Sequence, residues 1–129
     1  AMNRALREGL IEDDSMFILG EDIGEYGGAY AVTKGLLKEF GSKRVMESPI
    51  AESGFLGAGI GAAMGGLRPV VEIMTINFML LAMDQIVNHA AKIRYMSGGQ
   101  FNVPLIIRTV TGGGGQLGAT HSQSLESCL

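Results

Sequence analysis

The stretch Pro49-Ile50-Ala51-Glu52-Ser53-Gly54-Phe55 joins a strand-like run to a helix-like run that begins with small residues. The β-forming residues end at Ile50, and Pro49 disfavours a helix before it. After Glu52, glycine and alanine recur at helical spacing as far as Gly65. Because α/β proteins place their chemistry where a strand ends and a helix begins, Glu52 is the first residue that needs a role.

Strand-like and helix-like segments alternate along the rest of the chain. We predict helices from the start to Ile11, over Lys34–Phe40, from the small-residue run to Arg68-Pro69 and over Asn77–Met96, and strands over Met16–Gly20, Arg44–Ile50, Val70–Thr75 and Val103–Val110. Thr120 or Ser122 is predicted to cap one more helix. The alternation predicts an α/β fold with a mostly parallel sheet and helices on both faces.

Side chains that could do chemistry follow several of these strands. Ligands of parallel sheets bind beyond the carboxyl ends of the strands. We therefore expect one sheet edge to carry four groups: Glu21 with Asp22, Glu52, the segment Met74–Phe78, and the glycine loop that leads to His121. This convergence follows from the topology that the pattern predicts.

Each of these groups also has a structural interpretation. Glu52 could only favour the helix dipole, which is worth about 0.3–1 kcal/mol, and spacing alone favours that alternative. Met74 and Phe78 could be ordinary core residues, and the pattern leaves the role of His121 open. The run Gly57–Ala62 has only the weaker alanine ending of a dinucleotide fingerprint, so close helix packing accounts for it better.

Composition limits the class of protein. The 129 residues are 47% hydrophobic and 18% charged, which fits one globular domain. A net charge of −3 with scattered basic residues argues against nucleic-acid binding. Cys128 is the one cysteine, which excludes an intrachain disulfide, and the most apolar stretch, Gly54–Leu67, is too short to span a membrane. The chain begins and ends within helix-like patterns, so we expect a fragment.

Several motifs in register carry a family resemblance. They are Gly20-Glu21-Asp22-Ile23-Gly24, Gly27-Gly28-Ala29-Tyr30, Ser48 to Phe55, Gly65-Gly66-Leu67-Arg68-Pro69, Asp84 to Asn88, Tyr95-Met96-Ser97-Gly98-Gly99 and His121-Ser122-Gln123. Over nearly its whole length the chain resembles the β subunit of the thiamine-diphosphate-dependent first component of 2-oxo acid dehydrogenase complexes, of the pyruvate or acetoin type. The resemblance implies a transketolase-like pyrimidine-binding fold over residues 1–129, truncated before a C-terminal transketolase-like domain.

The resemblance also implies a role for the residues at the predicted edge. In the family, the glutamate matching Glu52 hydrogen-bonds a ring nitrogen of the cofactor's aminopyrimidine, which favours the imino tautomer that removes the thiazolium C2 proton. His121 matches the histidine near the substrate and the lipoyl group, so Glu52 and His121 are the expected catalytic residues. Cofactor binding is expected from Glu21, Ile50, Glu52, Met74 and Phe78. The backbone oxygen of Leu105 matches a potassium ligand of some members.

The implied activity is that of an oxidoreductase, with pyruvate dehydrogenase (acetyl-transferring) favoured as the enzyme. The chain contains no Gly-Asp-Gly motif for the cofactor diphosphate and its magnesium ion. The family places that motif on an α subunit, so we expect an αβ heterotetramer, a lipoyl-bearing acyltransferase partner, a 2-oxo acid substrate, and an inactive isolated chain. Bacterial members are cytoplasmic, and eukaryotic members lie in the mitochondrial matrix or plastid; no targeting segment is visible.

Three alternatives stay open. The chain could be an acetoin or branched-chain 2-oxo acid dehydrogenase β subunit, because the motifs do not identify the substrate. It could be another thiamine enzyme of transketolase-like or deoxyxylulose-phosphate-synthase-like type, although the His-Ser-Gln and Tyr-Met-Ser-Gly-Gly runs favour the dehydrogenase. It could also be a non-catalytic interaction module whose glycine-rich and methionine-rich helices are subunit interfaces.

Overall fold

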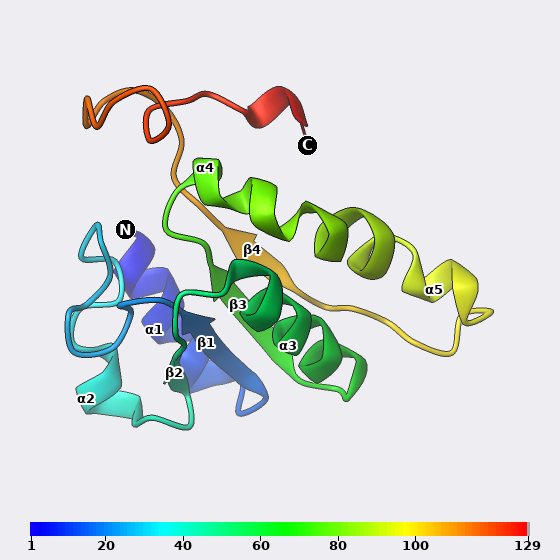
Figure 1. Cartoon of the computed structure of the whole chain (residues 1–129). Helices are drawn as coiled ribbons and strands as arrows, with labels where there is room; N and C mark the ends of the chain where they lie inside the picture. The colour runs from blue at the N-terminus through cyan, green and yellow to red at the C-terminus, as the bar shows by residue number, and fades with distance from the viewer. Residues whose placement is uncertain (129) are drawn as a thin grey trace.

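A four-stranded parallel sheet forms the centre of the protein in the computed structural model, which describes residues 1–128 (Figure 1). The strands are β1 (Met16–Gly20), β2 (Val45–Glu47), β3 (Arg68–Glu72) and β4 (Ile106–Arg108), in the order β2-β1-β3-β4. All three neighbouring pairs are parallel. The α/β fold with a parallel sheet is therefore confirmed.

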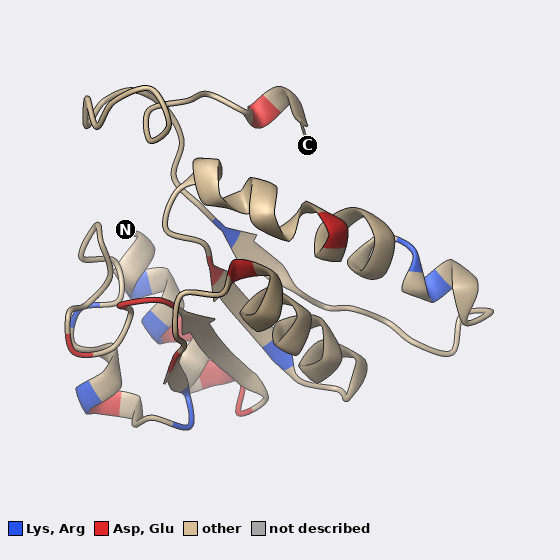
Figure 2. Ribbon diagram, viewed as in Figure 1, with Lys and Arg blue, Asp and Glu red and all other residues tan. Residues whose placement is uncertain are grey.

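The helices follow the strands as the alternation predicts. They are α1 (Met2–Glu12), α2 (Leu36–Phe40), α3 (Glu52–Met64), α4 (Ile76–Met79) and α5 (Ile93–Met96). Glu52 is the only charged residue of α3, so the helix lacks colour beyond its first turn in Figure 2. A helix without charged residues is suited to burial on several sides, and α3 packs against β3, β1 and the helical segment that follows α4.

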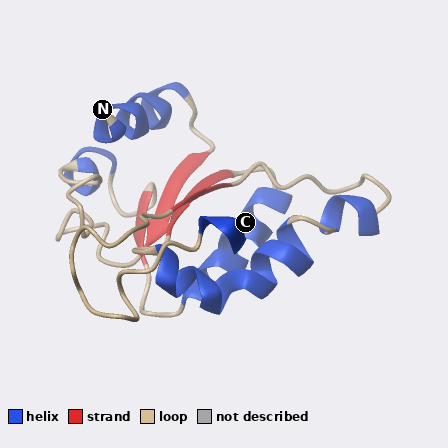
Figure 3. Ribbon diagram, turned by 90° about the horizontal axis from the view of Figure 1, so that it is seen from above, coloured by secondary structure: helices blue, strands red, loops and turns tan. Residues whose placement is uncertain are grey.

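Helices cover both faces of the sheet, as predicted, because successive strand residues point to opposite sides. One face packs under α3 and α4 through Phe17, Leu19 and Val71. The other packs under α1 and α2 through Ile18, Val45 and Val70. Figure 3 shows α1 and the group α3 to α5 on opposite sides of the strands. None of the helices within residues 1–128 is long and apolar enough to cross a membrane.

Two strand boundaries differ from the prediction because of proline. The strand predicted over Arg44–Ile50 ends at Glu47, just before Ser48 and Pro49. Conversely, Arg68 and Pro69 do not end α3, which stops at Met64; they open β3. The Arg68 amide donates to the Ser15 carbonyl on the β1 side. Pro69, which has no N–H, therefore faces the β4 side, where pairing starts only at Val70, and no ladder bond is lost.

The helix predicted over Asn77–Met96 is wrong as a single regular helix. The path is helical, but α4 passes into a 3₁₀ turn at Leu80–Ala82 and a π-helical turn at Gln85–Ala90 before α5. The Ala91 amide bonds the Ile86 carbonyl, five residues back. Hydrophobic spacing does not separate these closely related helical patterns. Packing beside α3 accompanies the change.

The C-terminal segments are shorter than predicted. The strand predicted over Val103–Val110 pairs only at Ile106–Arg108, and Pro104 has no amide to donate. The helix predicted after Thr120 or Ser122 is absent from the described residues as an α-helix. A 3₁₀ turn at Glu126–Cys128 takes its place.

Candidate active site

The carboxyl ends of the strands form one row at a single edge of the sheet. Gly20 of β1 is in register with Glu47 of β2 and Glu72 of β3, and Glu72 is in register with Arg108 of β4. The chain leaves this row toward Glu21, toward Glu52, toward α4 and toward the glycine loop. The four groups predicted for this edge therefore do start from it.

Glu52 is the first residue of α3 and is 5% exposed. The Phe55 amide bonds the Ala51 carbonyl, which begins the helix directly behind Glu52. Few carboxyl groups are buried to this extent without a partner or a function. The burial exceeds what a surface carboxylate needs in order to favour a helix dipole.

Glu21 is half-buried and lies beside Glu52. The pKa of Glu21 is raised, first by burial and then by the neighbouring Glu52 carboxylate, with a smaller contribution from Asp22. Its Oε1 atom is buried and has no hydrogen-bond partner within the described structure. Two neighbouring carboxyl groups away from bulk water favour a state in which one of them keeps its proton. The sequence predicted the two residues for one edge, and the structure brings their side chains together.

Phe78 and His121 form the second part of the site. Their rings contact edge to face, with centroids 5.2 Å apart and an angle of 82° between the planes. The Gln123 amide donates to Asn77 Oδ1 at 3.2 Å, which ties the His121 segment to α4. Thr120 Oγ1 lies 2.8 Å from His121 Nδ1. Phe78 is half-buried and His121 is exposed, so the histidine is open to a second molecule.

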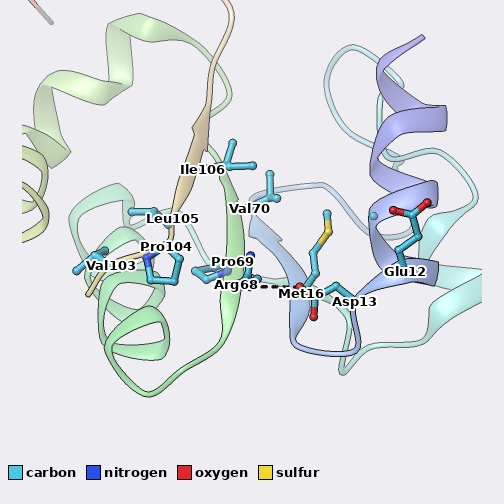
Figure 4. A pocket seen from close by; sticks show the side chains of 11 residues that line it. Glu12, Asp13, Met16, Arg68, Pro69, Val70, Val103, Pro104, Leu105 and Ile106 are labelled. Atoms are coloured by element: carbon cyan, nitrogen blue, oxygen red, sulfur yellow. Dashed lines mark ion pairs between the residues drawn. The ribbon is translucent and has the colours of Figure 1, made fainter. Parts of the chain in front are cut away.

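Met74, Ile50 and Leu105 differ in their surroundings. Met74 is half-buried in the connection from β3 to α4. Ile50 is 82% exposed beside Glu52 and lies outside any strand, contrary to the strand prediction. Leu105 precedes β4 and lines a cavity of about 460 Å³ (Figure 4). The cavity also contacts Met16 and Arg68, the first residues of β1 and β3, so it lies at the amino end of the sheet. The structure thus does not bring Leu105 to the edge that holds the other residues.

Two residues at this edge received no role from the sequence. Glu72 and Arg108, at the ends of β3 and β4, form an ion pair with Arg108 Nη1 2.5 Å from Glu72 Oε2. Glu72 is the one charged residue in an apolar run, and this signal could have identified it. Within residues 1–128, no group of three or more His, Cys, Asp or Glu side chains is arranged to hold a metal ion.

Comparisons with known proteins identify one matching family and several similar proteins. The family model described as "Transketolase, pyrimidine binding domain" matches residues 1–129. A Rickettsia bellii protein named "Pyruvate dehydrogenase E1 component subunit beta" is 52% identical over 99% of this chain, which covers 39% of that protein. Two Oryza sativa proteins of the same subunit type are also similar. The chloroplastic beta-4 protein is 55% identical over 98% of this chain, which covers 32% of that protein. The mitochondrial beta-1 protein is 54% identical over 95% of this chain, which covers 33% of that protein.

The chain therefore spans between about a third and two-fifths of the length of these curated relatives. The similar proteins include bacterial, chloroplastic and mitochondrial forms. Because the family model matches from the first residue to the last, the chain belongs to the transketolase pyrimidine-binding domain family.

Proposed function

We propose that this chain is the pyrimidine-binding part of a pyruvate dehydrogenase β subunit, in which Glu52 binds the aminopyrimidine of thiamine diphosphate. The observation that carries the proposal is the buried Glu52 carboxyl beside Glu21 at the carboxyl edge of a parallel sheet. The relatives reported above are named for pyruvate, which supports pyruvate over acetoin or branched-chain substrates. A longer subunit with a C-terminal transketolase-like domain would contain residues 1–129.

The residues at this edge fit an aminopyrimidine. A flat heterocycle with ring nitrogens needs a carboxyl partner in a dry place and a flat apolar surface beside it. Glu52 offers the carboxyl, and half-buried Phe78 and Met74 offer the apolar surface. Ile50, which is exposed next to Glu52, would contact the ring or contribute its backbone. When bound, the cofactor supplies a thiazolium ring that accepts the electron pair released by decarboxylation.

Glu52 and Glu21 would together hold the proton that is shared with the pyrimidine ring nitrogen. Burial favours the protonated form of a carboxyl group, and burial together with the Glu52 carboxylate raises the pKa of Glu21, which favours a proton on Glu21 beside Glu52. Glu52 can then hold its hydrogen bond to a ring nitrogen without exposing an unpaired charge to the apolar surroundings. The burial of Glu52 limits its contact with water, which strengthens the interactions of its carboxyl group.

His121 would act on the substrate side of the site. An imidazole exchanges protons near neutral pH, and its exposed position leaves it accessible to a lipoyl group on another protein. The contact with Phe78 and the Thr120 hydroxyl orient the ring. His121 can therefore deliver or accept a proton beside the pyrimidine-binding residues.

Other parts of the enzyme would lie elsewhere. The chain has no Gly-Asp-Gly motif, so an α subunit would hold the diphosphate and magnesium, and the isolated chain would be inactive. A lipoyl-bearing acyltransferase would receive the acyl group. A potassium ion at the Leu105 carbonyl would be a separate site, because Leu105 lies at the opposite end of the strands. The location in the cell would follow the source: cytoplasm, mitochondrial matrix or plastid.

Replacement of Glu52 by Gln in the full-length β subunit, reconstituted with its α partner, tests the proposal. Gln keeps the size of the side chain but cannot share a proton with the ring nitrogen. We expect proton exchange at C2 of bound thiamine diphosphate to slow by about 10²–10⁴-fold, the usual contribution of a positioned acid or base. An exchange rate equal to that of the wild type would refute the role of Glu52.

A further inference from the structure

The ion pair between Glu72 and Arg108 lies beneath the candidate active site and takes no part in the chemistry proposed above. Glu72 is the last residue of β3, and Arg108 is the last residue of β4. The Glu72 side chain is 4% exposed and that of Arg108 is 13% exposed. Taking two charges out of water is costly, and apolar residues of similar size often serve stability equally well. Stability alone therefore does not explain the pair.

The two chain segments that leave the ion pair run side by side to the candidate site. Directly after the pair, the Ile73 amide donates to the Arg108 carbonyl at 2.9 Å. Farther along, the Ile76 amide donates to the Val110 carbonyl at 2.8 Å. Beyond these bonds, one segment carries Phe78 and the other carries His121, whose rings are in contact. The pair is thus the base of two tied segments that end in site residues.

A third segment also rests on Glu72. A Cβ atom at Gly28 would lie 3.4 Å from Glu72 Oε1 and 3.0 Å from the buried hydroxyl of Thr33. Gly28 belongs to the loop that follows Glu21, and its amide donates to the Asp22 carbonyl at 2.8 Å. Gly28 has a φ of +84°, which glycine adopts without strain. The Glu72 carboxylate therefore lies against the Glu21 loop as well as against Arg108.

We propose that Glu72 and Arg108 are positioning residues, which hold the segments carrying Glu21, Phe78 and His121 at the separations that the active site needs. The inference rests on the proposed function, because it assigns those segments to one site. The attraction between Arg108 Nη1 and Glu72 Oε2, 2.5 Å apart and poorly hydrated, joins two specific atoms, which apolar packing does not. The pair would restrict the relative positions of the last residues of β3 and β4 more tightly than packing does.

The test uses the full-length β subunit with its α partner and the double variant Glu72→Met/Arg108→Met. The double variant avoids the single buried charge that could prevent folding. Met matches Glu in length and replaces the aliphatic part of Arg. We expect thermal stability close to that of the wild type. Amide hydrogen exchange should rise at least tenfold in residues 73–78 and 109–123, and not in β1 or β2. Turnover of the double variant should fall at least tenfold. The single variant Arg108→Lys, which keeps the positive charge, should have a turnover between those of the double variant and the wild type.

A matched control is the exposed pair of Arg7 and Glu39, whose side chains are 48% and 39% exposed. Its double replacement by Gln should leave exchange in both site segments and turnover within twofold of the wild type. The positioning role is refuted if the Met/Met variant shows wild-type exchange and turnover, or if exchange rises equally throughout the sheet. If the wild-type complex does not bind thiamine diphosphate, the proposed function fails, and hydrogen exchange alone then decides whether the pair orders the two segments.

Discussion

Replacement of Gly59 by Ala tests how closely α3 must approach the sheet to place Glu52. Gly59 is buried in α3, and a Cβ there would lie 2.6 Å from Cγ2 of Val71, a fully buried β-branched residue of β3. Carbon atoms prefer about 3.5–4.0 Å, so α3 or Val71 must move by roughly 1 Å. Gly61, in the same helix, is exposed and has nothing within 4 Å of such a Cβ. It is the matched control.

The magnitudes follow from these surroundings. Overpacking of a well-filled core costs about 1–3 kcal/mol, whereas replacing a helical glycine by alanine gains about 1 kcal/mol. Gly59→Ala should therefore lose up to about 2 kcal/mol of unfolding free energy, and Gly61→Ala should gain about 1 kcal/mol. Because α3 begins at Glu52, a helix displaced by about 1 Å should also slow catalysis, by up to about a hundredfold.

Both quantities can be measured on the full-length protein. Urea unfolding of the subunit gives the stability difference, and turnover of the reconstituted αβ complex gives the rate. Equal stability of the two variants would show that Val71 accommodates the extra methyl group without moving α3. A destabilised Gly59→Ala variant with wild-type turnover would show that the position of Glu52 does not depend on the approach of α3 to the sheet.

Three further predictions concern single side chains. Because the pKa of Glu21 is raised, its protonated form stabilises the fold below the ordinary glutamate pKa, and this stabilisation is lost as the pH rises through the higher pKa of the folded state. Glu21→Gln should therefore flatten the pH dependence of the unfolding free energy between these two pKa values. An unchanged pH profile would contradict the pairing of Glu21 with Glu52. Arg44 donates to the carbonyls of Leu10, Asp13 and Met16 at 2.7–2.8 Å, so Arg44→Ala should cost about 2 kcal/mol in urea unfolding. Arg4→Ala, which removes an exposed pair with Glu8, should cost less than about 0.5 kcal/mol, and similar losses for the two arginine variants would contradict this reasoning. Phe78→Leu should weaken thiamine diphosphate binding roughly three- to tenfold, measured by calorimetry on the αβ complex, since aromatic stacking contributes about 0.5–1.5 kcal/mol beyond burial; an unchanged affinity would exclude stacking.

Several elements could be predicted from local chemistry alone. The strand Met16–Gly20 matches its prediction, because four apolar residues between turn-forming residues have few alternatives to a buried strand. The helix that begins at Glu52 matches too, because Pro49 ends the preceding strand and small residues then recur at helical spacing. The boundaries that failed depend on partners: β4 is short because only Ile106–Arg108 faces a paired strand.

The candidate site divides in the same way. Topology predicted that Glu21, Glu52, Phe78 and His121 share one edge, since the carboxyl ends of parallel strands meet there. The ring contact between Phe78 and His121 and the effect of Glu52 on the pKa of Glu21 depend on the connecting segments. Those segments are held by long-range hydrogen bonds such as that from the Gln123 amide to Asn77, 46 residues away. No local pattern encodes such a pairing.

The sequence by itself determined the strand-to-helix order, the parallel sheet, and the position of Glu52 at a strand-to-helix junction, because these follow from spacing, proline and β-propensity over a few residues. Only the tertiary structure decided that Glu52 is buried against Glu21 and that Glu72 and Arg108 meet beneath the site. Burial and ion pairing depend on which distant segments pack together. Spacing alone would assign Glu52 to a helix dipole. The packing of distant segments instead buries its carboxyl group at the edge where the active site is proposed.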